Sequence, residues 1–304
     1  MVARVATFAL NDSMISAALR TQAKISERQI QTASGKVSAD YGGLGATSKK
    51  VIDLQVSISQ SKSYEDAASS ADNRVQAMYS ATGSITDLLS SYKSELTSAI
   101  SASGSNDTSA LSSSAAGFMS EMASLLNTQY GGRYLFAGSR TETAPVDLSA
   151  YSNTTSVTDA DTSYYTGDDQ LASVKVSDSQ YITYGATASN PAFEKAMRAF
   201  SMIANATSSP IDSSTLSDAL DLATTALDGV TGVQTKLSLS ATQLERAVSN
   251  QQTYQSDAST LSDSLTNVDV AAVTAEISTY QAQLEASYSA ISKIQSLRLS
   301  DYLR

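Results

Sequence analysis

The sequence contains no cysteine, no histidine and no tryptophan, and only 16% of its residues are charged. Without cysteine, a disulfide framework and a thiolate nucleophile are both excluded. Without histidine or cysteine, the usual zinc and iron sites and histidine-based acid–base catalysis are excluded as well. We therefore expect a protein that is not an enzyme and that holds neither a metal ion nor a cofactor.

Positive charge and long apolar runs are also scarce. The net charge is −10, whereas nucleic-acid binding requires a basic surface that displaces counterions, so no nucleic-acid partner is expected. No segment approaches the ~18 consecutive apolar residues that a membrane-spanning helix needs, so no membrane insertion is expected. Arg4 and Asp12 interrupt the apolar N-terminus, which argues against a Sec-type signal peptide.

Proline is rare and confined to the middle of the chain, at Pro145, Pro191 and Pro210. Because proline breaks the interior of a helix, the regions on either side are free to form long helices. The spacing of apolar residues on the N-terminal side predicts a helix over roughly 46–102. A break is expected at residues 103–106, where small and polar residues gather.

Further helices are predicted around the central region. The segments 111–125 and 193–203 have helical apolar spacing, and a long helix follows Pro210. Gly229 and Gly232 are expected to loosen that long helix, because glycine is a poor helix former. Residues 267–269, Asn-Val-Asp, offer a cap for a last helix.

The central region has a different pattern, with short apolar runs separated by Gly, Asp, Ser and Thr. Residues 134–138 form one such run after Gly131 and Gly132, and residues 171–184 alternate between apolar and polar. This pattern predicts a small antiparallel β-rich insert with turns at residues 167–169 and at Gly185. Its aromatic residues form either the small core of the insert or a binding surface, and they are Tyr134, Phe136, Tyr164, Tyr165, Tyr181 and Tyr184.

Both ends of the chain carry apolar residues at steps of three and four, the spacing of one helix face. The C-terminal stripe, which Ser287 interrupts, consists of Val270, Val273, Ile277, Tyr280, Leu284, Ile291 and Ile294. The N-terminal stripe consists of Leu10, Met14, Ala18, Thr21 and Ile25, and Ile15, Ala17 and Leu19 broaden it. Such stripes must be buried, so we expect the two ends to pack against each other.

The predicted fold is mainly α, with a long antiparallel helical coiled coil or bundle formed by both chain ends and a small β-rich central insert. Five segments are expected along the chain. They are an N-terminal assembly helix and loop (1–45), an N-terminal helical arm (46–129), a β-rich outer insert (130–190), a returning helical arm (191–266) and a C-terminal assembly helix (267–304).

Several motifs near the ends resemble the bacterial flagellin family. At the C-terminal end these are residues 267–271 (Asn-Val-Asp-Val-Ala), 283–288 and 297–303. At the N-terminal end, residues 32–36, Thr-Ala-Ser-Gly-Lys, are similar to the turn between the first two helices of that family. Taken together these motifs are specific, although each one alone is weak.

The central motif resembles the branch of the family that forms the hook–filament junction. Residues 132–138, Gly-Arg-Tyr-Leu-Phe-Ala-Gly, carry this likeness, with Thr141, Thr143 and Pro145 after them. Residues 165–168 lie where that branch has a Tyr-x-Gly turn. Residues 40–45 depart from the sequence common in filament flagellins, which favours the junction branch or a divergent filament flagellin.

The resemblance implies an axial subunit of the bacterial flagellum that is exported through the flagellar type III channel and lies outside the cell. The implied partners are copies of itself in a helical tube, hook or hook-associated proteins, flagellin and an export chaperone. Within the tube the terminal helices are expected to pack on one another. The predicted assembly interface consists of Leu10, Met14, Ile25, Val273, Ile277, Tyr280, Leu284, Ile291 and Ile294.

Several alternatives stay open at this point. The terminal stripes suit the core of a monomeric helical bundle, and the central insert suits a cell-surface adhesin. The glycine-rich residues 42–45 lack the spacing of a phosphate-binding loop, so an ordinary interhelical loop is preferred. Asp159, Asp161, Asp168 and Asp169 match no calcium-binding spacing, so they are interpreted as solvated turn residues.

Overall fold

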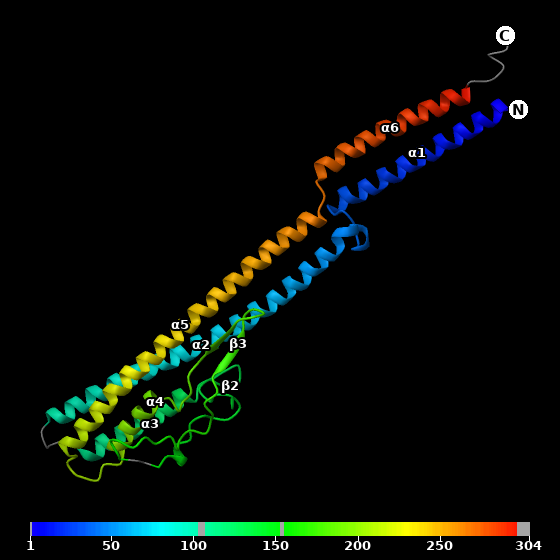
Figure 1. Cartoon of the computed structure of the whole chain (residues 1–304). Coiled ribbons are helices and arrows are strands. Elements are labelled where there is room, and N and C mark those ends of the chain that lie inside the picture. The colour runs from blue at the N-terminus through cyan, green and yellow to red at the C-terminus, as the bar shows by residue number, and fades with distance from the viewer. Residues whose placement is uncertain (1, 103–106, 153–154, 297–304) are drawn as a thin grey trace. The chain divides into compact units, whose positions relative to one another are not determined.

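The computed structural model describes residues 2–102, 107–152 and 155–296 (Figure 1). The helices are α1 (Val2–Ser34), α2 (Ser48–Ser101), α3 (Thr108–Leu126), α4 (Pro191–Ala204), α5 (Ser213–Thr266) and α6 (Val270–Ser296), with short 3₁₀ helices at Gly42–Thr47 and Leu148–Ala150. The strands are β1 (Gln129–Tyr130), β2 (Arg133–Tyr134), β3 (Ala172–Lys175) and β4 (Tyr181–Tyr184). The prediction of a mainly α fold is confirmed.

The chain forms two compact units. The terminal unit consists of residues Met1–Gln60 and Tyr254–Arg304, and the central unit consists of Ser61–Thr253. The division falls within α2 and within α5, and both helices are continuous across it. Each unit is described separately below.

The predicted helices of the arms are confirmed. The helix expected over roughly 46–102 is α2, and those expected at 111–125 and 193–203 are α3 and α4. The predicted break at 103–106 lies outside the described residues. The expected cap of the last helix is provided by Asp269, whose carboxylate accepts hydrogen bonds from the backbone N–H groups of Ala271 (2.9 Å) and Ala272 (3.1 Å).

The expectation that two glycines loosen α5 is wrong. The helix runs without interruption from Ser213 to Thr266. A Cβ atom at Gly229 would lie 2.7 Å from the Cβ of Ala192, which is closer than two carbon atoms can approach. Because Gly229 has no side chain, α4 packs directly against the backbone of α5 at this point. Gly229 thus serves a contact between two helices and does not interrupt α5.

The core of the central unit gathers residues from all of its helices. Tyr92 of α2 stacks edge-on against Phe118 of α3 and Phe200 of α4, with ring centroids 5.4 and 4.7 Å apart. Its buried hydroxyl donates a hydrogen bond of 2.7 Å to the backbone oxygen of Ala199. Leu237 and Leu244 of α5 are fully buried in the same cluster. The apolar residues that the sequence placed on helix faces thus form this core.

The insert contains two antiparallel hairpins joined by irregular segments. Gly131 and Gly132 have positive φ angles of 58° and 76°, which the tight turn between β1 and β2 requires. The second hairpin pairs β3 with β4, and Val174 lies opposite Ile182. The predicted turn at Gly185 is a residue with φ of 102° directly after β4.

Most aromatic residues of the insert belong to its core. Phe136, Tyr164 and Tyr184 are buried, and the Phe136 ring packs edge-on against Phe193 of α4 at 5.9 Å. Only Tyr181, 63% exposed, points mainly to solvent among the six aromatic residues considered as a binding surface. The core interpretation of this set is therefore the better one.

The aspartates of the insert serve as turn residues. The Asp168 carboxylate accepts hydrogen bonds from the backbone N–H groups of Ser139 (2.8 Å) and Gln170 (3.1 Å). Asp161 accepts one from the N–H of Ser163 at 2.8 Å. In the part of the chain that the structure describes, no group of acidic residues is arranged to hold a metal ion. None of the described helices is long and apolar enough to cross a membrane.

Candidate assembly surface

The two terminal helices, α1 and α6, lie side by side in the terminal unit (Figure 1). The Nε atom of Arg28 lies 2.7 Å from the carboxylate of Glu276. One turn away along each helix, the ammonium group of Lys24 lies 5.5 Å from the centroid of the Tyr280 ring. Because residue numbers fall along α1 while they rise along α6, the two helices are antiparallel.

The predicted stripe residues line the contact between these helices, but only a few are fully buried. Ile25 and Val273 are 8% and 7% exposed, and Ala18 is buried beside them. Six further predicted residues are half-buried, namely Met14, Ile277, Tyr280, Leu284, Ile291 and Ile294. Leu10 is 52% exposed and contributes little to the packed face. A two-helix contact leaves such stripes half open to solvent, because each helix covers only one side of the other.

A short backbone bridge fastens the inner ends of the pair. Lys36 and Asn267 form an isolated antiparallel bridge, in which the Val37 N–H donates to Thr266 (2.7 Å) and the Val268 N–H donates to Gly35 (3.0 Å). The Lys36 ammonium group also donates to the Asn267 side-chain oxygen at 2.7 Å. The two segments that resemble motifs of the flagellin family, 32–36 and 267–271, thus meet at one point of the terminal unit.

The terminal unit exposes most of the large apolar side chains that face solvent. In the described part of the chain seventeen such side chains are exposed, and eleven of them belong to this unit. They are Leu10, Ile15, Leu19, Ile30, Tyr41, Ile52, Val56, Tyr254, Leu261, Val270 and Tyr288. Where such side chains gather into one patch, they mark a place where another molecule can bind.

Charged side chains are also distributed unequally between the two units. Residues 61–253 contain ten basic and twenty acidic side chains, and the terminal unit contains ten of each, which together make the 20 and 30 of the whole chain. The net charge of −10 therefore belongs entirely to the central unit. A neutral, apolar terminal unit can approach another copy without net repulsion, whereas the central unit carries the charge that keeps the chain in solution.

The polar contacts of the pair were not anticipated from the sequence. Arg28 follows Ile25 by three residues, so it stands at the next stripe position of α1, and Glu276 directly precedes the stripe residue Ile277 of α6. Opposite charges at and beside the two stripes were the available signal. Gln31, which is buried and donates to the backbone oxygen of Val37 at 2.9 Å, gave no such signal.

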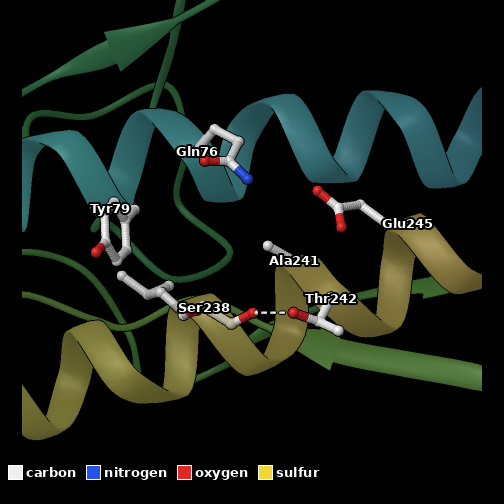
Figure 2. Close-up of a pocket in the computed structure, with 7 residues that line it drawn as sticks. Gln76, Tyr79, Ser238, Ala241, Thr242 and Glu245 are labelled. Atoms are coloured by element: carbon white, nitrogen blue, oxygen red, sulfur yellow. Dashed lines mark hydrogen bonds between the residues drawn. The ribbon is translucent and has the colours of Figure 1, made fainter.

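A shallow pocket in the central unit was considered as an alternative site (Figure 2). Its volume is about 120 Å³, and Gln76 and Tyr79 of α2 face Thr242 and Glu245 of α5 across it. The Thr242 hydroxyl donates to the backbone oxygen of Ser238 on its own helix at 3.0 Å. The hydroxyl is thereby engaged by its own helix and is not directed at a ligand.

Residues 220–303 match the family of the bacterial flagellin C-terminal helical region. This part of the chain is therefore similar to the C-terminal helical region of bacterial flagellins. The match covers most of α5 and all of α6. No sequence among the curated proteins matches this chain.

Two solved structures share the fold of this chain. A Vibrio parahaemolyticus protein described as a flagellar hook-associated protein is 15% identical, with a TM-score of 0.59, and the match covers 75% of this chain and 99% of that one. The flagellar hook-associated protein 3 of Legionella pneumophila is 13% identical, with a TM-score of 0.57, and the match covers 70% and 98%. At these identities the likeness concerns the fold.

Proposed function

We propose that this chain is an axial subunit that joins the flagellar hook to the filament and polymerises through its paired terminal helices. The observation that carries the proposal is the half-buried contact of α1 with α6, in a unit that exposes eleven large apolar side chains and has no net charge. Half-buried stripes gain their remaining burial only when neighbouring subunits cover them. The resemblance of residues 132–138 to the junction branch, and the shared fold with two hook-associated proteins, favour the junction role.

Assembly buries the predicted interface residues. Ile277, Leu284 and Ile291 face α1 with part of their surface still open, so that a neighbouring subunit completes their burial. Fully burying such a side chain contributes roughly 1.5–3 kcal/mol. Because every subunit repeats the contact, one charged substitution on this stripe is present at every interface of the assembly.

In this role the chain is exported through the flagellar type III channel, and a chaperone covers its terminal helices. A chain without cysteine forms no disulfide that would have to be broken before export. The terminal unit has few fully buried residues of its own. The burial gained in the assembly offsets the conformational entropy that such a unit loses when it folds. A chaperone would cover the same apolar surface before assembly.

A filament-forming flagellin is the second candidate, favoured by the family match over residues 220–303. The two candidates differ in what the purified chain forms by itself. We would add short filament seeds or a precipitating salt and examine the product by electron microscopy. Long regular filaments made of this chain alone would reject the junction role. Persistent monomers, or short stubs that stop growing, are expected if the chain needs hook below and flagellin above.

Substitutions in the stripe test the assembly mode separately. Leu284→Asp and Ile277→Asp are expected to abolish incorporation into axial structures, because a carboxylate would be buried without a partner. The matched control is Leu239→Asp, at an exposed leucine of α5 in the central unit, which should be incorporated normally. Normal incorporation of the Leu284→Asp chain would show that α6 is not the polymerising element.

A further inference from the structure

A groove in the terminal unit lies beside the segment that connects α1 to α2. Its volume is about 490 Å³, and its walls come from residues 34–44, the start of α2 and the end of α5. Ala39, Tyr41, Leu44 and Ile58 give it part of an apolar lining. Lys36, Asp40 and Asp263 also line it, and the Lys36 ammonium group lies 3.8 Å from the Asp263 carboxylate. The groove is large enough for the side chains of one or two apolar residues.

The walls of this groove are fixed by hydrogen bonds. The Tyr41 hydroxyl donates to the side-chain oxygen of Gln55 on α2 at 2.7 Å. The Asp40 carboxylate accepts from the N–H of Gly43 at 2.9 Å, so the chain turns sharply into the 3₁₀ helix Gly42–Thr47. The connecting segment thus forms a preorganised surface, and an incoming side chain need not order it.

A matching ridge lies on the outer face of α1. Ile15 and Leu19 are one turn apart on the same face, and they are 38% and 61% exposed. Arg20 lies beside Leu19, is exposed, and forms no ion pair with any described residue. A ridge with an exposed cation complements the groove, whose charged lining of Lys36, Asp40 and Asp263 is net negative because Lys36 balances only one of the two carboxylates.

The ridge cannot fill the groove of its own chain. Leu19 precedes the groove residue Ser34 by fifteen residues of continuous helix, a distance of about 22 Å at the rise of an α-helix. A ridge and a groove at different places on one surface make a head-to-tail contact between copies. Contacts of this type close into rings or continue as helical assemblies. Both arrangements suit a subunit of a tube.

We propose that the Ile15–Leu19 ridge of one copy seats in the groove beside residues 38–44 of the next copy, with Arg20 facing Asp40. This contact rests on the proposed function, because it requires that copies of the chain meet in an assembly. The neutrality of the terminal unit permits the approach, since ten basic and ten acidic residues leave no net repulsion there. The contact is separate from the α1–α6 stripe, which faces inward within one chain.

Cysteine cross-linking tests the contact directly, because the natural chain has no cysteine and gives no background. The double variant Leu19→Cys/Ala39→Cys would be produced in the source bacterium and the axial structures detached from the cells and mildly oxidised. Seated ridges bring the two residues of neighbouring copies within the ~4.4–6.8 Å Cα separation of a disulfide. The expected result is a ladder of covalent oligomers on a non-reducing gel.

The control variant is Leu19→Cys/Val56→Cys, because Val56 is exposed in the same unit but does not line the groove. It should give no ladder. Axial structures that contain the Ala39 variant without a ladder, or an equal ladder in the Val56 control, would overturn the ridge-and-groove contact and leave the proposed function standing. Absence of the unmodified chain from axial structures would instead reject the proposed function.

A second measurement does not depend on disulfide geometry. Leu19→Gln is expected to lower the amount of chain retained in axial structures on the order of tenfold, because the contact then buries a polar amide in place of leucine. Leu239→Gln, at an exposed leucine of the central unit, should be retained at the natural level. Equal retention of both variants would contradict the proposal.

Discussion

Lys36 and Asn267 lie 231 residues apart in the chain, yet their backbones form an antiparallel bridge. The bridge ties the segment after α1 to the segment between α5 and α6, so the inner ends of both terminal helices are anchored at one place. Gly35, with a φ of 68°, ends α1 in the left-handed conformation that glycine adopts at low cost and directs the chain into the bridge. The antiparallel pairing of α1 and α6 follows from this anchor.

Removing one bond of the bridge should therefore loosen the helix pair. Val268→Pro abolishes the N–H that donates to the Gly35 oxygen, while proline remains acceptable just before the Asp269 cap. We expect faster amide hydrogen exchange in the first turns of α6 and at Val37, measured by mass spectrometry of the soluble chain. Val268→Ala keeps the N–H and serves as the control. Identical exchange in the two variants would mean that the bridge does not hold the pair.

Alanine substitutions at two glycines of α5 are expected to change the stability of the chain in opposite directions. Gly229→Ala places a methyl group 2.7 Å from the Cβ of Ala192 and 3.3 Å from its Cα, so α4 must move away. We expect a loss of about 1–3 kcal/mol in the free energy of unfolding. At Gly232 no atom lies within 4 Å of the added methyl group, so Gly232→Ala should stabilise the chain by about 0.5–1 kcal/mol through helix propensity. Urea unfolding measures both, and a stabilising Gly229→Ala would contradict the close packing.

A buried ion pair fastens the insert to α4. Nη2 and Nε of Arg198 each lie 3.2 Å from the Glu194 carboxylate, and both side chains are almost fully buried. The Arg198 guanidinium also donates to the Val157 oxygen at 2.8 Å, and Glu194 accepts from the Asp161 N–H at 3.0 Å. The pair therefore holds two points of the insert as well as one turn of α4.

Breaking this pair should be costly. Glu194→Gln leaves the Arg198 charge buried without its counter-charge, so we expect a loss of about 3–5 kcal/mol in the free energy of unfolding. The double variant Glu194→Gln/Arg198→Met removes the stranded charge and should lose less than the sum of the two single variants. Strictly additive losses in urea unfolding would show that the two side chains do not act together.

The helices could be predicted from the sequence because their apolar spacing and proline-free flanks are local signals. The Asp269 cap was local as well. The role of Gly229 could not be predicted, since it depends on Ala192, which approaches from another helix. From the sequence alone, Gly229 suggested a weak point in a helix, whereas in the structure it allows a close contact between two helices.

For the assembly surface, the sequence revealed the stripes but not how deeply each residue is buried. Ile25 and Leu10 belong to the same predicted stripe, yet Ile25 is buried and Leu10 is exposed, because the contact with α6 covers only part of that face. The groove could not be predicted from the sequence either, since it combines residues 34–44 with the end of α5. Such long-range combinations leave no periodic trace in the sequence.

Two aspartates of the insert link the stability of the central unit to pH. Its carboxylate accepts hydrogen bonds from the Ser139 hydroxyl, from the Ser139 N–H and from the Gln170 N–H, and these hold its pKa below the ordinary value of 3.8. Hydrogen bonds from Ser149 lower the pKa of Asp147 in the same way. Because both pKa values are lower in the folded than in the unfolded chain, their stabilising contribution is present above about pH 4 and is lost as the pH falls through the folded values.

We therefore expect the melting temperature of the natural chain to fall between about pH 4 and pH 2 more steeply than that of Asp168→Asn. An amide cannot take up the proton, so the variant loses the acid-dependent part of this contribution and starts from a lower melting temperature at pH 7. Circular dichroism melts across this range give the two curves. Asp221→Asn, which removes an exposed carboxylate of α5, controls for the change in net charge and should follow the natural curve. Parallel curves for the natural chain and Asp168→Asn would mean that the Ser139 hydrogen bonds do not favour the ionised carboxylate in solution.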